Sequence, residues 1–181
     1  MTPITSLIIA SVAIAIFVAY NIILIAMYGV PQSLSHTFYY IKEHGHSGWW
    51  FTAMMWIVCG LLIAPWITIN HGISDWSHYL DCLPFLTCAA LLFSSLAGNA
   101  RDNETTKQVH LIGARFAAVT AILWICVCCW KIMYVIPIWI LLIGAIAHLT
   151  KTAKFGRDYW IEWVAFGPTF TAIIVEAILQ L

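Results

Sequence analysis

The last apolar stretch of the chain carries the residue types best able to do chemistry. Glu162, Thr169 and Glu176 recur at intervals of seven residues, and Ala165 and Ala172 lie between them. Because a seven-residue interval drifts by only about 20° around a helix, these positions form one stripe. A carboxyl group at bilayer depth is costly unless it faces a cavity or a partner. We therefore expect the stripe to face the protein interior; the alternative is that the two glutamates reach water at opposite ends of the helix.

A second group of polar residues opens the fourth apolar stretch. His110 and Arg115 lie there about 140° apart around a helix, so they do not share one narrow face. Arg115 either extends outward to phosphate headgroups or pairs with an inward carboxylate such as Glu162, and His110 is either a ligand or an interfacial hydrogen-bonding residue. Such groups at one membrane level are what a pocket for a small molecule or lipid headgroup requires. The further candidates at this level are Ser33, Ser35, Tyr39 and His148.

The second connector offers a rival site on the opposite side of the membrane. His71, Asp75, His78 and Asp81 are spaced by four, three and three residues, which predicts one helical face. Histidine with carboxylates is a plausible ligand set for a divalent metal. A short solvated helix uses the same residue types, so a structural role is the alternative. Apart from this possible metal, we expect no cofactor.

The elements that must position these residues are six apolar stretches, each long enough to cross a bilayer as a helix. Of the 181 residues, 62% are hydrophobic and 9% are charged, against about 25% charged in soluble domains. The sequence therefore predicts an all-α protein, with residues 1-181 forming a single six-helix transmembrane domain with short loops. The predicted spans are about 4-28, 49-70, 80-98, 109-130, 132-150 and 160-180.

The basic residues predict the orientation of this bundle. By the positive-inside rule, connectors rich in lysine and arginine are cytoplasmic. The even connectors hold only Lys131, and the termini hold no lysine or arginine. We therefore expect the odd connectors in the cytoplasm and both termini outside it. The basic residues of the odd connectors are Lys42, Arg101, Lys107, Lys151, Lys154 and Arg157.

Three short segments carry a resemblance to other proteins. They are Ser33 to Tyr40, with serines at 33 and 35 and tyrosine at 39, then Val109 to Ala114, and finally Ile161 to Phe166. On these segments the chain resembles a group of small bacterial integral membrane proteins, some of them carried by prophages. The resemblance implies six helices and a multi-pass protein of the bacterial inner (cytoplasmic) membrane. It directs attention to Ser33, Ser35, Tyr39, His110 and Glu162, but it implies no activity.

The chain is more distantly similar to membrane hydrolases of the ceramidase and progestin-receptor superfamily. That similarity implies a serine, an aspartate and three histidines on seven helices, with an intramembrane zinc. This chain departs from the pattern, because it has six predicted helices and no pair of histidines four residues apart in its last helix.

Three functions remain open from the sequence. The first is a polar cavity near the cytoplasmic side that binds or passes a lipid headgroup, a small molecule or an ion. The second is an accessory or host-modulating membrane subunit that contacts partner helices or further copies of itself. The third is an enzyme, either a metal-dependent intramembrane hydrolase or a Ser/His acyl-group enzyme. It is disfavoured because there is no nucleophile elbow, phosphate loop or HExxH motif. Membrane lipids are expected partners, and nucleic acid is excluded because the formal net charge is zero.

Overall fold

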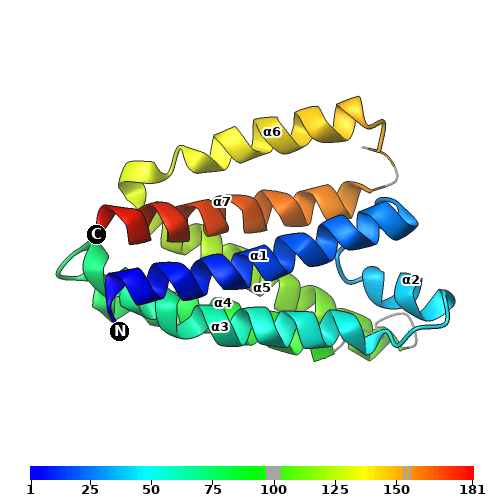
Figure 1. The fold of residues 1–181 in the computed structure, drawn as a ribbon, viewed down its shortest axis with the longest axis horizontal. Coiled ribbons are helices and arrows are strands. Elements are labelled where there is room, and N and C mark those ends of the chain that lie inside the picture. The colour runs from blue at the N-terminus through cyan, green and yellow to red at the C-terminus, as the bar shows by residue number, and fades with distance from the viewer. Residues whose placement is uncertain (97–102, 153, 155) are drawn as a thin grey trace.

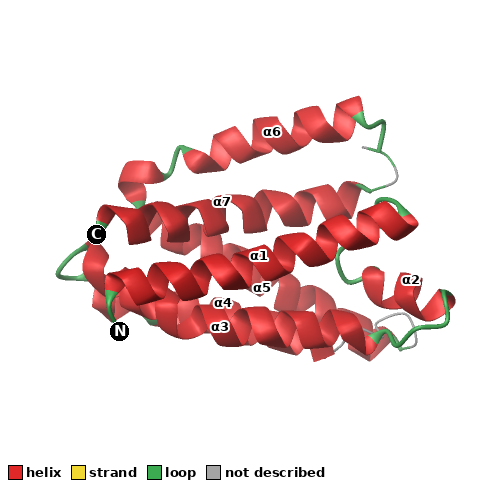
Figure 2. Cartoon of the chain, viewed as in Figure 1, coloured by secondary structure: helices red, strands yellow, loops and turns green. Residues whose placement is uncertain are grey.

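The computed structural model describes residues 1–96, 103–152, 154 and 156–181, and every regular element in these residues is a helix (Figures 1 and 2). The long helices run side by side. Both termini lie at one end of the molecule, and α2 lies at the other (Figure 1). In chain order the elements are α1 (Pro3–Tyr28), α2 (Thr37–Glu43), α3 (Trp49–Ile73), η1 (Ser77–Leu80), α4 (Cys82–Leu96), α5 (Glu104–Val127), η2 (Trp130–Ile132), α6 (Val135–Leu149) and α7 (Arg157–Leu179).

The predicted all-helical class is confirmed, and six helical segments are long and apolar enough to cross a membrane. They are Pro3–Tyr28, Trp49–Ile73, Ser77–Leu96, Glu104–Val127, Trp130–Leu149 and Arg157–Leu179. These segments match the predicted spans closely. Residues 97 and 98, at the end of the predicted third span, and Arg101 in the following connector lie outside the described residues.

Helix caps explain where the spans begin. The hydroxyl of Thr2 accepts the backbone N–H of Thr5, and Pro3 occupies the first turn of α1, where its missing N–H costs nothing. The side chain of Asn103 accepts the N–H of Thr105 at 2.8 Å and starts α5. That cap adds a polar first turn to α5, so the helix begins before the apolar stretch that predicted a start at 109.

Aromatic side chains fill the contact between α1 and α7. The ring of Phe17, which is fully buried, lies 5.5 Å from that of Trp163, 4.9 Å from that of Phe166 and 5.2 Å from that of Phe170. The outer surfaces of the helices are apolar as well; Leu141 on α6, for example, is 74% exposed. Apolar residues on both the inside and the outside are typical of helices that lie in lipid.

A buried asparagine ties α3, η1 and α5 together near the end of the molecule where the termini lie. The Nδ2 of Asn70, a fully buried residue, donates to the carbonyl of Ser77 at 2.7 Å and to Oδ1 of Asp81 at 2.8 Å. Its Oδ1 accepts the indole N–H of Trp124 at 2.9 Å, and its carbonyl accepts the hydroxyl of Ser77. The buried indole N–H of Trp124 therefore depends on the side chain of Asn70, which is its acceptor among the described contacts.

We predict that Asn70→Ala destabilises the protein strongly. The change leaves the indole N–H of Trp124 and the carbonyl of Ser77 without this partner, and each buried unsatisfied group costs about 1–3 kcal/mol. Thermal unfolding in detergent should show a clear fall in Tm. Thr68→Ala is the matched control, because within the described residues that hydroxyl bonds to the carbonyl of Ala64 on the same helix and to no other group. Equal shifts in the two variants would contradict the role given to Asn70.

Candidate functional site

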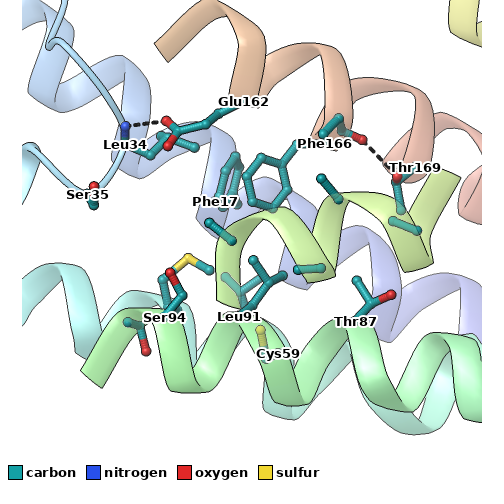
Figure 3. Close-up of a pocket in the computed structure, with 18 of the residues that line it drawn as sticks. Phe17, Leu34, Ser35, Cys59, Thr87, Leu91, Ser94, Glu162, Phe166 and Thr169 are labelled. Atoms are coloured by element: carbon teal, nitrogen blue, oxygen red, sulfur yellow. Dashed lines mark hydrogen bonds between the residues drawn. The ribbon is translucent and has the colours of Figure 1, made fainter. Parts of the chain in front are cut away.

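A cavity of about 550 Å³ lies among α1, α3, α4, α5 and α7 (Figure 3). Its volume falls within the range of about 300–1,000 Å³ that is typical of ligand pockets. Most of the wall is apolar, with Phe17 from α1, Leu62 from α3, Leu91 from α4 and Phe166 from α7 among the residues that line it. The cavity therefore offers hydrocarbon surface along most of its length.

The polar lining groups gather toward the α2 end of the cavity. Figure 3 shows Glu162 and Ser35 at one end of the view and Thr87 and Thr169 at the other. Ser33, Arg115, Arg157 and Asp158 also line the cavity; the hydroxyl groups of Ser33 and Ser35 lie 3.0 Å apart. Five of the predicted site residues thus share one cavity at this end: Ser33, Ser35, His110, Arg115 and Glu162.

Glu162 fastens the segment between α1 and α2 to α7. The backbone N–H of Leu34 donates to Oε2 of Glu162 at 2.5 Å (Figure 3). The N–H of Tyr159 donates to the carbonyl of Gln32 at 2.9 Å. Gly156, just before α7, allows the close approach, since a Cβ there would lie 2.9 Å from Cγ1 of Val30. The segment 30–35 therefore forms part of the cavity wall, held by two hydrogen bonds to the first turns of α7.

His110 joins α5 to α4. Its Nδ1 lies 2.8 Å from the carbonyl of Ser94 and 3.0 Å from the hydroxyl of the same residue, and that hydroxyl donates to the carbonyl of His110 at 3.1 Å. Because a carbonyl only accepts, Nδ1 carries its hydrogen and does not take a proton from Ser94. The pair has the residue types of a nucleophile and its base, but in this arrangement it holds two helices together.

The predicted stripe on α7 lies inside the bundle. Thr169 lines the cavity and donates to the carbonyl of Ala165 at 2.8 Å, and Ala165 lines the cavity one turn earlier. Ala172 and Glu176 are also buried, but they do not line the cavity. Glu176 is therefore an interior residue nearer the opposite end of α7, and only the first part of the stripe contributes to the site.

Arg115 lines the cavity without the ion pair that was one of its two alternatives, and two other candidate residues lie outside the cavity. Arg115 does not pair with Glu162: it is exposed on α5 and forms no ion pair within the part of the chain that the structure describes, while Glu162 accepts a backbone N–H. His148 is exposed on α6, which packs against α7 at the edge of the bundle, so it lies outside the cavity (Figure 1). Tyr39 does not line the cavity either, because it sits on α2 with its ring against Phe38.

The four residues of the predicted metal site do not share one helical face. α3 ends at Ile73, and η1 starts only at Ser77, so the chain turns between the two histidines. His71 and Asp81 do form a pair, with Nε2 and Oδ2 2.5 Å apart, on the surface. Over residues 1–96, 103–152, 154 and 156–181, no three histidine, cysteine, aspartate or glutamate residues are placed to hold a metal ion. The predicted ligands His71, Asp75, His78 and Asp81 therefore form no such group.

The sequence interpretation missed several polar residues that hold the cavity walls. Thr87 on α4 and Thr120 on α5 meet with their hydroxyl groups 2.8 Å apart, and Ser94 bonds to His110. The sequence signal for these contacts was the presence of single polar residues inside apolar stretches, which in membrane helices often mark contacts between neighbouring helices.

Comparisons of the chain with protein-family models, curated proteins and solved structures found no match.

We predict that Glu162→Ala loosens the segment 30–35. The change removes the hydrogen bond from the N–H of Leu34, worth about 0.5–1.5 kcal/mol, so this amide should exchange its hydrogen about two- to ten-fold faster. Hydrogen exchange followed by mass spectrometry measures this. Asp158→Ala is the control, because that exposed carboxylate lies near the segment and pairs with Arg157 at 3.5 Å, but it forms no hydrogen bond to the described residues of the segment. Unchanged exchange in Glu162→Ala would show that this contact does not hold the segment.

Proposed function

We propose that this chain is an integral membrane protein that binds a small molecule in the cavity among α1, α3, α4, α5 and α7. The observation that carries the proposal is the distribution of chemistry within one cavity of about 550 Å³. Serine, arginine and carboxylate side chains gather at the α2 end, and the remaining wall is largely apolar. A pocket with a few polar groups at one end orients a ligand there and buries the rest of it.

Two further observations support this proposal. Six helical segments are long and apolar enough to span a bilayer, so the cavity would lie within the membrane with its polar end near one surface. The polar contacts between α4 and α5, made by Thr87, Thr120, Ser94 and His110, satisfy those side chains within the protein. The groups left for a ligand are therefore mainly those at the α2 end, including Arg115.

For the orientation, we propose that the α2 end faces the cytoplasm. The segments at this end contain Lys42, Lys107, Lys151, Lys154 and Arg157, whereas the opposite end contains Lys131. This asymmetry supports a cytoplasmic polar end of the cavity and two extracytoplasmic termini. Given the resemblance to small bacterial membrane proteins, the proposed location is the cytoplasmic membrane of a bacterium.

This orientation predicts the behaviour of reporters fused to the chain. A reporter that is active only in the cytoplasm should give no signal when it is fused after Leu181, because that end is proposed to lie outside. The same reporter inserted after His46, in the connector between α2 and α3, should be active. The reverse pattern would overturn the orientation.

The cavity itself is tested by filling it. Ala165→Phe places a ring in the cavity from α7, whereas Ala145→Phe places the same ring on an exposed position of α6. After gentle purification, native mass spectrometry should detect a small molecule on the unmodified protein and on Ala145→Phe. The occupied fraction should fall several-fold in Ala165→Phe, because the ring takes up ligand volume. Equal occupancy in both variants, or none in the unmodified protein, would contradict the proposal.

A further inference from the structure

We propose that the ligand is a single-chain amphiphile with an anionic head group, of the fatty-acid class, and that it enters sideways from the bilayer between α5 and α7. This inference rests on the proposed ligand-binding function and names the class of ligand. Three features of the cavity carry it: an interior with few free polar groups, two arginine side chains at one end, and residues shared with a groove on the outside of the bundle.

The interior of the cavity suits a hydrocarbon chain. Val58, Leu62 and Leu91 are among the side chains that line it farther from the polar end. The hydroxyl of Thr169, on the α7 side of the cavity, already donates within its own helix. A polar metabolite would lose its water here and find few partners in return, whereas an alkyl chain loses nothing by burial.

The polar end suits an anion. Arg115 lines the cavity and forms no ion pair within the described residues, and Arg157 meets Asp158 only at 3.5 Å on the exposed surface. Of the carboxylates at this end, Glu162 is engaged by the N–H of Leu34. A guanidinium group can bind a carboxylate or phosphate through two parallel hydrogen bonds, so Arg115 is the residue assigned to the head group.

The route follows from residues that face two spaces at once. Arg157 and Ile161 on α7 line both the cavity and a shallow groove of about 200 Å³ between α6 and α7. The groove is otherwise formed by apolar residues and Trp160, and Ile161 is 60% exposed. On the facing side, Ala114 and Ala118 of α5 line the cavity and are small. Ile161 therefore lies between the cavity and the lipid side, and the proposed route passes this side chain.

Quenching of tryptophan fluorescence by dibrominated stearic acid tests the ligand class in proteoliposomes. Bromine quenches only on close approach, and Trp66, which is 2% exposed, lines the cavity. We expect a saturable quenching component that unbrominated stearic acid displaces and that neutral stearyl alcohol displaces poorly. Trp66→Phe should remove this component; if that variant does not fold, displacement by stearic acid alone decides. Brominated lysophosphatidylcholine distinguishes a phospholipid source from a free fatty acid, and saturable quenching by that lipid alone would overturn the assignment to fatty acids.

Variants test the head group and the route separately. Arg115→Gln should weaken binding of the brominated acid about ten-fold, through loss of a charge-assisted contact, while Lys107→Gln, at an exposed position paired with Glu104, should not. Ile161→Trp should slow the onset of quenching several-fold, while Leu141→Trp, which adds the same ring on α6, should not. Equal effects within either pair would overturn that part of the inference.

The fatty-acid inference and the proposed function can fail separately. If no saturable quenching occurs while a molecule still copurifies and is lost in Ala165→Phe, the fatty-acid inference fails and the proposed function stands.

Discussion

Helices in a bilayer gain little from burying apolar surface against one another, so close packing and interhelical hydrogen bonds determine which helices meet. This constraint applies to the six helical segments that are proposed to span the bilayer. α4 and α5 are joined twice, through the hydroxyl groups of Thr87 and Thr120 and through Ser94 with His110. Gly113 brings the two backbones close, since a Cβ there would lie 3.1 Å from the carbonyl oxygen of Ala90. The described structure has no comparable polar contact between α5 and α7, and the cavity lies on that side.

α7 is held by its other surfaces. Tyr159 donates to Oδ1 of Asn21 on α1 at 3.3 Å, and the ring of Phe17 packs against the aromatic side of α7. On the side toward α6, Gly167 leaves room for the ring of Trp139, because a Cβ would lie 2.4 Å from that ring. The indole N–H of Trp139 donates to the hydroxyl of Thr171 at 2.9 Å. With α1 and α6 fixed in this way, the alanine-containing side of α7 is left to line the cavity.

Much of the architecture could be predicted from the sequence, because span length, low charge and the seven-residue stripe are local properties. The interior position of Thr169 and Glu176 followed from periodicity alone. The partner of Glu162 did not, since a backbone N–H such as that of Leu34 has no sequence signal. The position of His148 depended on which helix lies at the edge of the bundle, and the face proposed for His71 and Asp81 failed because α3 ends between them.

We propose that the space between α5 and α7 is a ligand site rather than a packing gap. The most direct test is an experimental structure of the protein in lipid nanodiscs, at a resolution that separates side chains. We expect elongated ligand density along the cavity that ends beside the guanidinium of Arg115. The hydrogen bond between Leu34 and Glu162 should be in place. A structure in which α5 and α7 close together and their own side chains fill the space would contradict the proposal.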